Sequence, residues 1–176
     1  MLAPSELILN PDGSVYHLHL RPEQIATTII TVGDPDRVAA VSKHFDRIDT
    51  RVQKREFVTH TGELGGKRLS VISTGIGTDN IDIVLNELDA LVNIDLQTRE
   101  IKKDLTSLNL IRIGTSGSMQ ADVEVDSFLA TETALGMDGL LNFYEKQPTN
   151  LATIELENAF LSFCKKNNIG LPVSPY

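Results

Sequence analysis

The sequence has little of several features that define whole classes of protein. Among its 176 residues there is one cysteine and no tryptophan, and only 5% are aromatic. A lone cysteine, Cys164, cannot form an intrachain disulfide or a thiolate metal cluster, and its place in a helical pattern predicts a packed thiol. The four histidines show no metal-ligand spacing, and we expect no metal and no organic cofactor: they are His17, His19, His44 and His60.

Basic residues and long apolar runs are also scarce. Sixteen Lys and Arg residues face 24 Asp and Glu residues, which gives a formal charge of −8 and an isoelectric point near 4.9. Such a chain repels nucleic acid and anionic membranes, so we expect neither as a partner. No apolar run approaches the roughly 18 residues that span a bilayer, and a basic signal region is lacking. We expect a cytoplasmic protein in which any anion site is a local cluster of arginine.

The familiar nucleotide-binding motifs are incomplete in this sequence. The pair Gly75 and Gly77 lacks the third glycine of a dinucleotide motif, because position 80 is Asn80. The pair Gly66-Lys67 lacks the hydroxyl residue of a P-loop, because position 68 is Arg68. There is also no Ser/His/Asp arrangement with a nucleophile elbow. These failures argue against a Rossmann cofactor, a P-loop nucleotide and a serine hydrolase.

Strands and helices alternate along the sequence. The β-branched run over 27–32 predicts a buried strand, and a helix over about 35–45 follows with Asp34 as its N-cap. This alternation predicts an α/β fold with a mixed, mostly parallel twisted sheet flanked by helices, in one domain over 1–176. The other expected elements are a hairpin over 51–73 that turns at Gly65-Gly66, an amphipathic helix over 81–92 capped by Thr78 or Asp79, a loop or short helix over 95–106, strands over 108–113 and 127–131, and a helix over 153–168 with Leu156, Ala159, Phe160 and Phe163 inward and Gly170 as its stop.

Three short segments directly after expected strands combine glycine with arginine or with hydroxyl residues. Glycine lets backbone N–H groups approach an anion closely, and arginine adds a fork of charged donors. A helix N-terminus contributes a partial positive charge. Together these features predict an oxyanion site, with phosphate as the ligand. The segments are Gly33-Asp34-Pro35-Asp36-Arg37, Ser73-Thr74-Gly75-Ile76-Gly77 and Arg112-Ile113-Gly114-Thr115-Ser116-Gly117.

Each of these residues also has an ordinary interpretation. Arg37 alone could be a surface arginine on a strand-to-helix turn, and Thr115 could simply bond its local turn. Arg112 is the stronger candidate, because a charge inside an apolar strand must be solvated or paired, and a bound anion would pair it. Arg55 and His17 are both expected to be exposed surface residues when judged by their local sequence alone.

Four motifs follow one another along the sequence: Val32-Gly33-Asp34-Pro35-Asp36-Arg37-Val38, Arg55-Glu56-Phe57, Ser73-Thr74-Gly75-Ile76-Gly77 followed by Glu87-Leu88, and Arg112-Ile113-Gly114-Thr115-Ser116-Gly117. Together they resemble the nucleoside phosphorylase family, whose members include uridine phosphorylase. The resemblance covers about residues 15–140, and within the family the second and fourth motifs are more similar to uridine phosphorylases than to the bacterial purine enzymes.

The resemblance implies phosphorolysis of a nucleoside, with uridine as the expected substrate and inorganic phosphate as co-substrate. Phosphate attacks the anomeric carbon as the base departs, and the arginines position it, with Arg112 and Thr115 as the catalytic residues. It also implies a homo-oligomer built from dimers, which could extend to a hexamer. The implied roles are phosphate binding by Gly33, Arg37, Arg55 of a neighbouring copy, Arg112 and Thr115, nucleoside binding by His17 of a neighbouring copy, Thr115 and Gly117, and, as a lesser alternative, a monovalent cation near Glu56, Ile76 and Asn80, although Asn80 departs from the serine usual there.

The chain lacks motifs that family members carry in their later part, namely the residues that read the base and grip the ribose hydroxyls. It therefore resembles the phosphate half of the site, as an incomplete domain. Two alternatives remain open: a nucleoside hydrolase of the same fold, which uses water and does not need all three arginines, and an inactive fragment that binds phosphate or a nucleoside.

Overall fold

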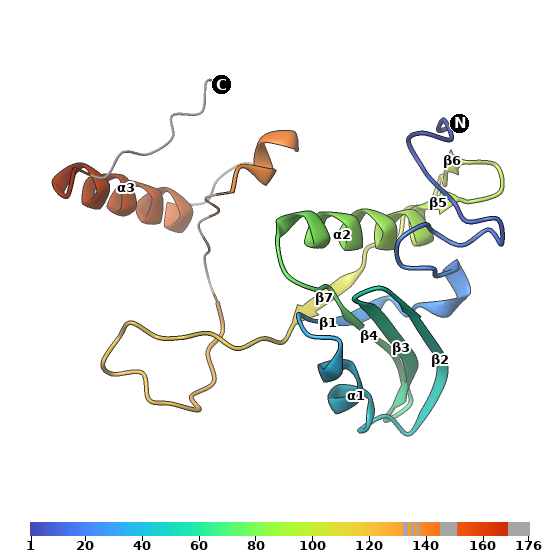
Figure 1. The fold of residues 1–176 in the computed structure, drawn as a ribbon, viewed down its shortest axis with the longest axis horizontal. Coiled ribbons are helices and arrows are strands. Elements are labelled where there is room, and N and C mark those ends of the chain that lie inside the picture. Colours follow the sequence, from blue (N-terminus) through green and yellow to red (C-terminus); the bar gives the residue numbers. More distant parts are fainter. Residues whose placement is uncertain (132–133, 135, 137, 145–150, 169–176) are drawn as a thin grey trace. The chain divides into compact units, whose positions relative to one another are not determined.

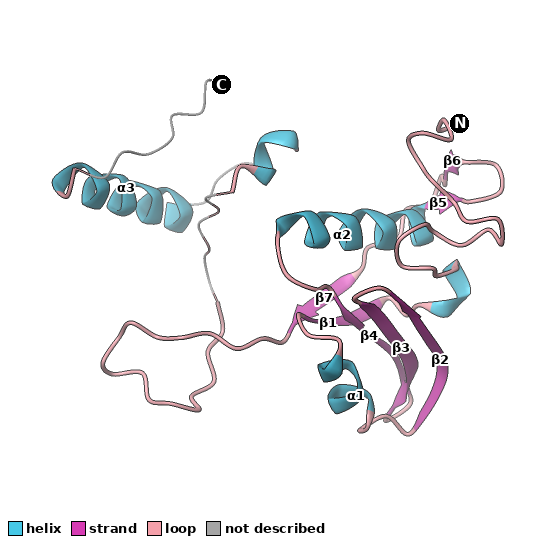
Figure 2. Cartoon of the chain, viewed as in Figure 1, coloured by secondary structure: helices cyan, strands magenta, loops and turns pink. Residues whose placement is uncertain are grey.

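The computed structural model describes residues 1–131, 134, 136, 138–144 and 151–168. The chain forms two compact units, Met1–Ser116 and Gly117–Tyr176. The first unit contains a five-stranded sheet and the helices around it (Figures 1 and 2). Its elements are η1 (Pro22–Gln24), β1 (Thr28–Val32), α1 (Asp36–Ser42), β2 (Arg47–Lys54), β3 (Phe57–Leu64), β4 (Lys67–Ser73), α2 (Thr78–Asn93), β5 (Ile94–Asp95), β6 (Glu100–Ile101) and β7 (Asn109–Arg112).

The sheet is mixed, as expected, with the strand order β2-β3-β4-β1-β7. β1 pairs in parallel with both β4 and β7, whereas β2, β3 and β4 form antiparallel pairs. Val32 is in register with Ser73, and Thr31 with Arg112. The carboxyl ends of β1, β4 and β7 therefore meet at one edge, which is where α/β sheets bind their ligands.

The two helices of this unit cover opposite faces of the sheet (Figure 1). Strand residues alternate between the faces, so the neighbours Val71 and Ile72 are both fully buried but belong to different cores. The core under α2 contains Val15, Leu18, Leu20, Ile25, Ile29, Phe57, Ile72, Val84, Leu88 and Leu91. The core under α1 contains Val32, Val38, Phe45 and Val71.

The prediction of a single hairpin over 51–73 is wrong in one respect. The part before the Gly65-Gly66 turn contains two strands, β2 and β3, where one was expected. β2 and β3 are joined by the tight turn Arg55-Glu56, in which Arg55 has φ +55°. Neither residue is a glycine, so the local sequence gives little sign of the turn. The segment over 95–106 is likewise not a plain loop or helix. β5 and β6 pair there as a small antiparallel hairpin, with Arg99 at φ +58°.

The expected helix caps lie one residue off. The N-cap of α1 is Pro35, yet the carboxylate of Asp34 still accepts the N–H of Asp36 at 2.9 Å. The N-cap of α2 is Gly77, with φ +100°, and Thr78 is the first helical residue. A β-branched or acidic residue would be strained at that φ, which explains why glycine rather than Thr78 or Asp79 takes the position.

The second unit contains η2 (Leu140–Phe143) and α3 (Leu151–Lys166). The expected strand over 127–131 is wrong: these residues are irregular, and Phe128 is fully exposed. Apolar composition alone does not make a strand where no neighbouring strand pairs with it. In α3 the expected inward position of Phe163 is also wrong, since Phe163 is 58% exposed. Its neighbour Cys164 is buried, as predicted.

Other expectations for this unit have mixed outcomes. Ala159 is exposed rather than inward, and Phe160 is half-buried. The side chain of Leu156 and the expected stop at Gly170 lie outside the described residues. The interpretation of 1–176 as one incomplete domain stays a prediction. Within the described part of the chain, no helix combines the length and apolar character needed to cross a membrane.

Candidate functional site

A cavity of about 640 Å³ opens at the edge where β1, β4 and β7 end. Residues from all three predicted segments line it, although they are far apart in sequence. Gly33, Arg37, Arg112 and Thr115, four of the five expected phosphate ligands, are among them. The full lining is Gly33, Asp34, Pro35, Arg37, Glu56, Gly75, Ile76, Asn80, Arg112, Gly114 and Thr115.

Arg112 is the last residue of β7, and its guanidinium lies beside two glycines. A Cβ built on Gly33 would be 3.9 Å from Nη2, and one built on Gly114 would be 3.7 Å from Cζ. Any larger side chain at either position would compete for the space that the guanidinium occupies. Arg112 is exposed, so solvent already satisfies its charge. Of the two states that the sequence left open for this charge, solvated or paired, the structure shows the solvated one, and the role of Arg112 in binding an anion stays a prediction.

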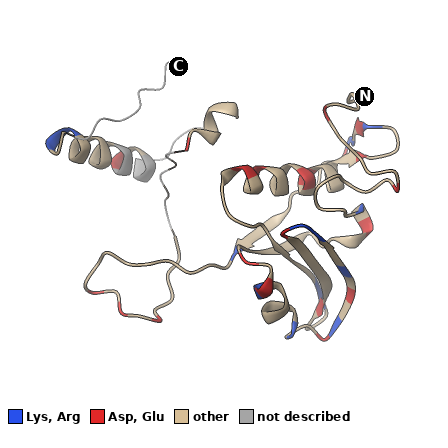
Figure 3. Cartoon of the chain, viewed as in Figure 1, with Lys and Arg blue, Asp and Glu red and all other residues tan. Residues whose placement is uncertain are grey.

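Arg37 lies in the first turn of α1, is exposed, and lines the same cavity. No carboxylate of the described residues forms an ion pair with Arg37 or Arg112. Elsewhere the charges are dispersed: the charged side chains of α2 are all acidic, and β2 has both acidic and basic side chains (Figure 3). Two unpaired guanidinium groups in one cavity are thus a local concentration of positive charge in an acidic chain, and they suit a doubly charged anion.

Two carboxylates also line the cavity, but each is bound by a donor of the chain. Asp34 accepts the backbone N–H of Asp36 at 2.9 Å. Glu56 accepts the side-chain amide of Asn80, with 3.0 Å between Oε1 and Nδ2. These hydrogen bonds direct the carboxylate oxygens toward donors of the protein, so the guanidinium groups remain the free donors of the cavity.

The Asn80–Glu56 pair bears on the cation that the family resemblance leaves open. An amide N–H is a donor and cannot ligate a cation, and here it bonds to Oε1 of Glu56, which leaves Oε2 as the other oxygen of that carboxylate. The pair packs directly on Gly75, which has φ +67°: a Cβ there would lie 2.5 Å from Nδ2 of Asn80 and 2.9 Å from Cγ of Glu56. Glu56, Ile76 and Asn80 line the same cavity, and a monovalent cation near them stays a prediction.

The remaining predicted site residues do not line the cavity. Arg55 is exposed in the turn next to Glu56. His17 lies in the segment before η1 and contacts Glu87 of α2, with 2.7 Å between Nδ1 and Oε1. Gly117 belongs to the second unit. The roles of all three stay predictions. Sequence analysis missed the pairing of Asn80 with Glu56, which no local pattern signals because 24 residues separate them.

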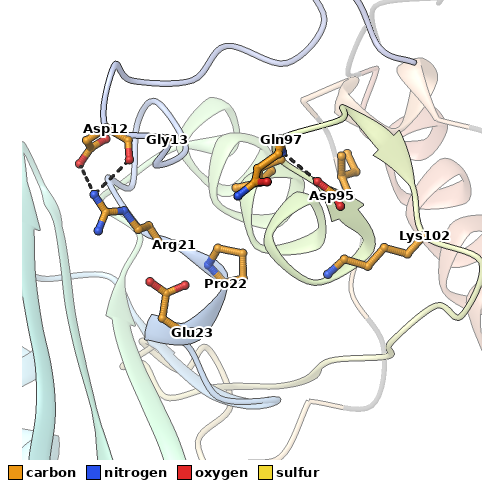
Figure 4. A pocket seen from close by; sticks show the side chains of 10 residues that line it. Asp12, Gly13, Arg21, Pro22, Glu23, Asp95, Gln97 and Lys102 are labelled. Carbon is orange, nitrogen blue, oxygen red and sulfur yellow. Dashed lines mark hydrogen bonds and ion pairs between the residues drawn. The ribbon is translucent and has the colours of Figure 1, made fainter.

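A second cavity, of about 530 Å³, lies near the start of β1 and the end of α2 (Figure 4). It also contains positively charged side chains, but other groups of the chain already accept their hydrogen bonds. Arg21 donates from Nη2 to the Asp12 carboxylate at 3.3 Å and to the Asp12 carbonyl at 3.0 Å. Lys102 donates from Nζ to the carbonyl of Val92 at 2.9 Å. This cavity is therefore a poorer anion site than the first.

Asp12 has an unusual electrostatic environment in that second cavity. Hydrogen bonds from the hydroxyl and the N–H of Ser14 hold the pKa of the Asp12 carboxyl well below its ordinary range. Asp12 therefore stays negatively charged into acidic solution, and it keeps attracting Arg21. Protonation of Asp12 itself therefore does not break this pairing in mildly acidic solution.

Comparison with known proteins identifies the family of the chain. The family model described as the phosphorylase superfamily matches residues 27–174. Over 156 residues the chain is 32% identical to uridine phosphorylase of Escherichia coli, covering 87% of the chain and 56% of that protein. It is 30% identical over 133 residues to uridine phosphorylase of Thermococcus kodakarensis, covering 76% of the chain and 43% of that protein.

A solved structure gives the same result for the fold. A nucleoside phosphorylase of Trypanosoma brucei, described as showing uridine phosphorylase activity, superposes with a TM-score of 0.72 at 31% identity. The match covers 86% of this chain and 52% of that one. The chain thus spans about half the length of the relatives it matches. With a family model that covers most of its residues and a solved relative that shares its fold, the chain belongs to the phosphorylase superfamily.

Proposed function

We propose that the chain takes part in the phosphorolysis of a nucleoside, uridine in the first instance, to the free base and ribose 1-phosphate. One observation carries the proposal: Arg37 and Arg112, from separate elements, line one cavity together with Gly33 and Thr115 and have no carboxylate partner among the described residues. The uridine phosphorylases among the relatives support the choice of substrate.

The reaction needs little covalent chemistry from the protein. A phosphate oxygen bonds to the anomeric carbon, the bond from that carbon to the base nitrogen breaks, and the base leaves with the bonding electrons and takes up a proton. Arg37 and Arg112 would hold the phosphate against the sugar, and the hydroxyl of Thr115 would donate to it. Positioning of this kind is worth up to about 7–11 kcal/mol. No protein nucleophile is required, and inorganic phosphate acts as co-substrate.

Residues that do not line the cavity enter this function through a neighbouring copy. Arg55, exposed in its turn, would reach the phosphate of the partner subunit, and His17 would reach the 5′-hydroxyl of the partner's ribose. Gly117 would line the base pocket. The proposal therefore includes a homo-oligomer built from dimers, with a hexamer as the larger assembly. The expected cytoplasmic location stays a prediction from the sequence.

A second candidate is a phosphate-binding chain without turnover. The edge strand β7 favours it, because Leu110 and Ile111 are 44% and 51% exposed on opposite sides of the strand. The chain also spans only about half the length of its relatives. In this case the arginine cavity would bind phosphate, but the groups that hold the nucleoside would be missing.

Release of free base separates these functions. The chain is mixed with uridine, thymidine, inosine or adenosine, each with and without phosphate, and the free base is followed by chromatography. Phosphate-dependent release from uridine supports the proposal. Release that does not need phosphate identifies a nucleoside hydrolase instead. No release from any substrate, with phosphate still binding, leaves the second candidate.

The same assay can test the cavity itself. Arg112→Ala should remove the stimulation by phosphate, whereas Arg47→Ala should keep it. Arg47 lies on β2, at the other edge of the sheet from β7, and its partner is Glu63 at 2.9 Å. Equal losses in the two variants would contradict the assignment of Arg112.

A further inference from the structure

His17 is held in place by a single carboxylate. The two oxygens of Glu87, on α2, accept hydrogen bonds from Nδ1 of His17 at 2.7 Å, from the backbone N–H of His17 at 2.9 and 3.0 Å, and from the backbone N–H of Leu18 at 2.8 Å. The Glu87 side chain is only 12% exposed, so these bonds lie largely out of solvent. Three donors on one shielded carboxylate leave it no free direction for a ligand of its own.

Packing fixes the same segment against α2. Val15, Leu18 and Leu20 are fully buried in the core that also contains Val84, Leu88 and Leu91 of the helix. Lys54 donates from Nζ to the carbonyl of Tyr16 at 2.6 Å, and the Tyr16 ring meets the His17 ring edge-on with centroids 4.9 Å apart. The imidazole is therefore restrained from several sides, while its side chain remains 28% exposed.

A carboxylate can only accept hydrogen bonds, so Nδ1 of His17 must carry the hydrogen. In the neutral imidazole the hydrogen is then absent from Nε2, which keeps its lone pair. No described residue forms a hydrogen bond with Nε2. A histidine with one nitrogen fixed by a carboxylate and the other free is suited to accept a hydrogen bond from a ligand hydroxyl.

We infer that Glu87 is a positioning residue: it fixes His17 as the Nδ1–H tautomer and thereby presents Nε2 as an acceptor for a ligand hydroxyl. The ligand part of this inference rests on the proposed function, in which His17 meets the 5′-hydroxyl of a nucleoside held by a neighbouring copy. The tautomer part does not depend on it. The sharpest test replaces Glu87 by glutamine, because an amide of the same shape has one acceptor and one donor.

The backbone N–H groups of His17 and Leu18 can only donate hydrogen bonds, whereas the imidazole can carry its hydrogen on either ring nitrogen. In Glu87→Gln the amide oxygen should therefore take the position of Oε2, where it accepts both N–H groups, and the amide NH₂ should take the position of Oε1 and face Nδ1. The His17 N–H, which bonds to both oxygens in the wild type, would keep only its bond to the amide oxygen. The imidazole would then accept at Nδ1 and carry its hydrogen at Nε2. A long-range proton–nitrogen NMR spectrum of the full chain at pH 8.5, where an ordinary imidazole is neutral, reports both nitrogens. His17→Asn assigns the signals.

We expect the Nδ1–H tautomer in the wild type, the Nε2–H tautomer in Glu87→Gln, and no change in Glu100→Gln, which removes an equal charge at an exposed site on β6. A wild type in the Nε2–H form or in a mixture would overturn the inference even if the variant failed to fold. A variant that kept the Nδ1–H form would show that Glu87 does not determine the tautomer.

Kinetics test whether the group that bonds to Nε2 of His17 is the 5′-hydroxyl of the nucleoside. Glu87→Gln should raise the KM for the nucleoside several-fold, the effect of weakening one hydrogen bond, with little change in kcat. The KM for the 5′-deoxynucleoside should stay the same. An equal rise for both substrates would overturn the hydroxyl as the ligand. If no base is released from any substrate, the proposed function fails, whereas the tautomer measurement still decides the role of Glu87.

Discussion

One cavity of the first unit lies where β1, β4 and β7 end, the other lies beside η1 and β5 (Figure 4), and both contain arginine. In the cavity near the start of β1, Arg21 is held by Asp12. In the cavity at the carboxyl ends of β1, β4 and β7, Arg37 and Arg112 have no such partner among the described residues. The comparison shows that the presence of a cation does not make an anion site: its donors must also be free.

The largest difference between the cavities should appear when their arginines are removed. The double variant Arg37→Ala/Arg112→Ala loses two charge-assisted donors, each worth about 1.5–3 kcal/mol, so phosphate affinity should fall by roughly a hundredfold or more. Arg21→Ala should leave phosphate affinity unchanged. Phosphate-dependent protection against thermal unfolding measures both. Equal losses in the two variants would remove the distinction between the cavities.

Each cavity also contains a glycine with positive φ, and these differ in what surrounds them. Gly13→Ala, at φ +82° with nothing within 4 Å of the new Cβ, should lower the free energy of unfolding by roughly 1–2 kcal/mol. Gly75→Ala, at φ +67°, should cost a further 1–3 kcal/mol or so, because its Cβ would displace the Asn80 amide 2.5 Å away. Urea unfolding compares them. A Gly75 variant no less stable than the Gly13 variant would contradict the packing described.

A smaller effect should follow from freeing a carboxylate in the first cavity. Asn80→Ala removes the donor that Glu56 accepts, and the unpaired carboxylate would repel phosphate, so affinity should fall several-fold. The double variant Asn80→Ala/Glu56→Gln should recover most of the loss, since the carboxylate whose charge Asn80 no longer offsets is gone. Calorimetric titration with phosphate measures each step. Without this recovery, repulsion by Glu56 is not the cause.

The smallest expected effect is a dependence of stability on pH, which should differ between the region of α1 and the second cavity. His60 on β3 is 9% exposed and shares a hydrogen bond with Ser42 of α1, with 2.8 Å between Nδ1 and Oγ. Burial, with a contribution from Arg51, lowers the pKa of His60. The unfolded chain therefore binds a proton first, so stability should fall as the pH drops below about 6.5, the ordinary histidine value.

In the second cavity Asp12 should stay charged over that range, because hydrogen bonds from Ser14 lower its pKa. Hydrogen exchange of the amides of α1 should accelerate between pH 7 and pH 5, after correction for the intrinsic rate, and that of Ser14 should not once His19→Gln removes the histidine that contacts Asp12 at 3.2 Å. In His60→Gln the pH dependence at α1 should disappear. If it persists, another group is responsible.

The site was more predictable than the chain's later part, and particular residues show why. The segments around Gly33 and Arg112 follow β-branched or apolar runs, and the rule that parallel strands end at one edge is general, so their convergence was foreseeable. The turn at Arg55-Glu56 lacked glycine, and the apolar residues over 127–131 had no strand to pair with. Turns without glycine and strands without partners depend on contacts that are distant in sequence.

By itself the sequence determined the alternation of strands and helices, the apolar faces of α1 and α2, and the residue types that follow β1, β4 and β7, because periodicity and steric preference act locally. Only the tertiary structure decided which charges are free. Arg21 and Arg37 are the same residue type, but one lies beside Asp12 and the other does not. Likewise Asn80 meets Glu56, and His17 meets Glu87, only because the sheet and α2 bring distant segments into contact. Electrostatic and hydrogen-bonding partners are set by distance in space, and that distance exists only once the cores have packed.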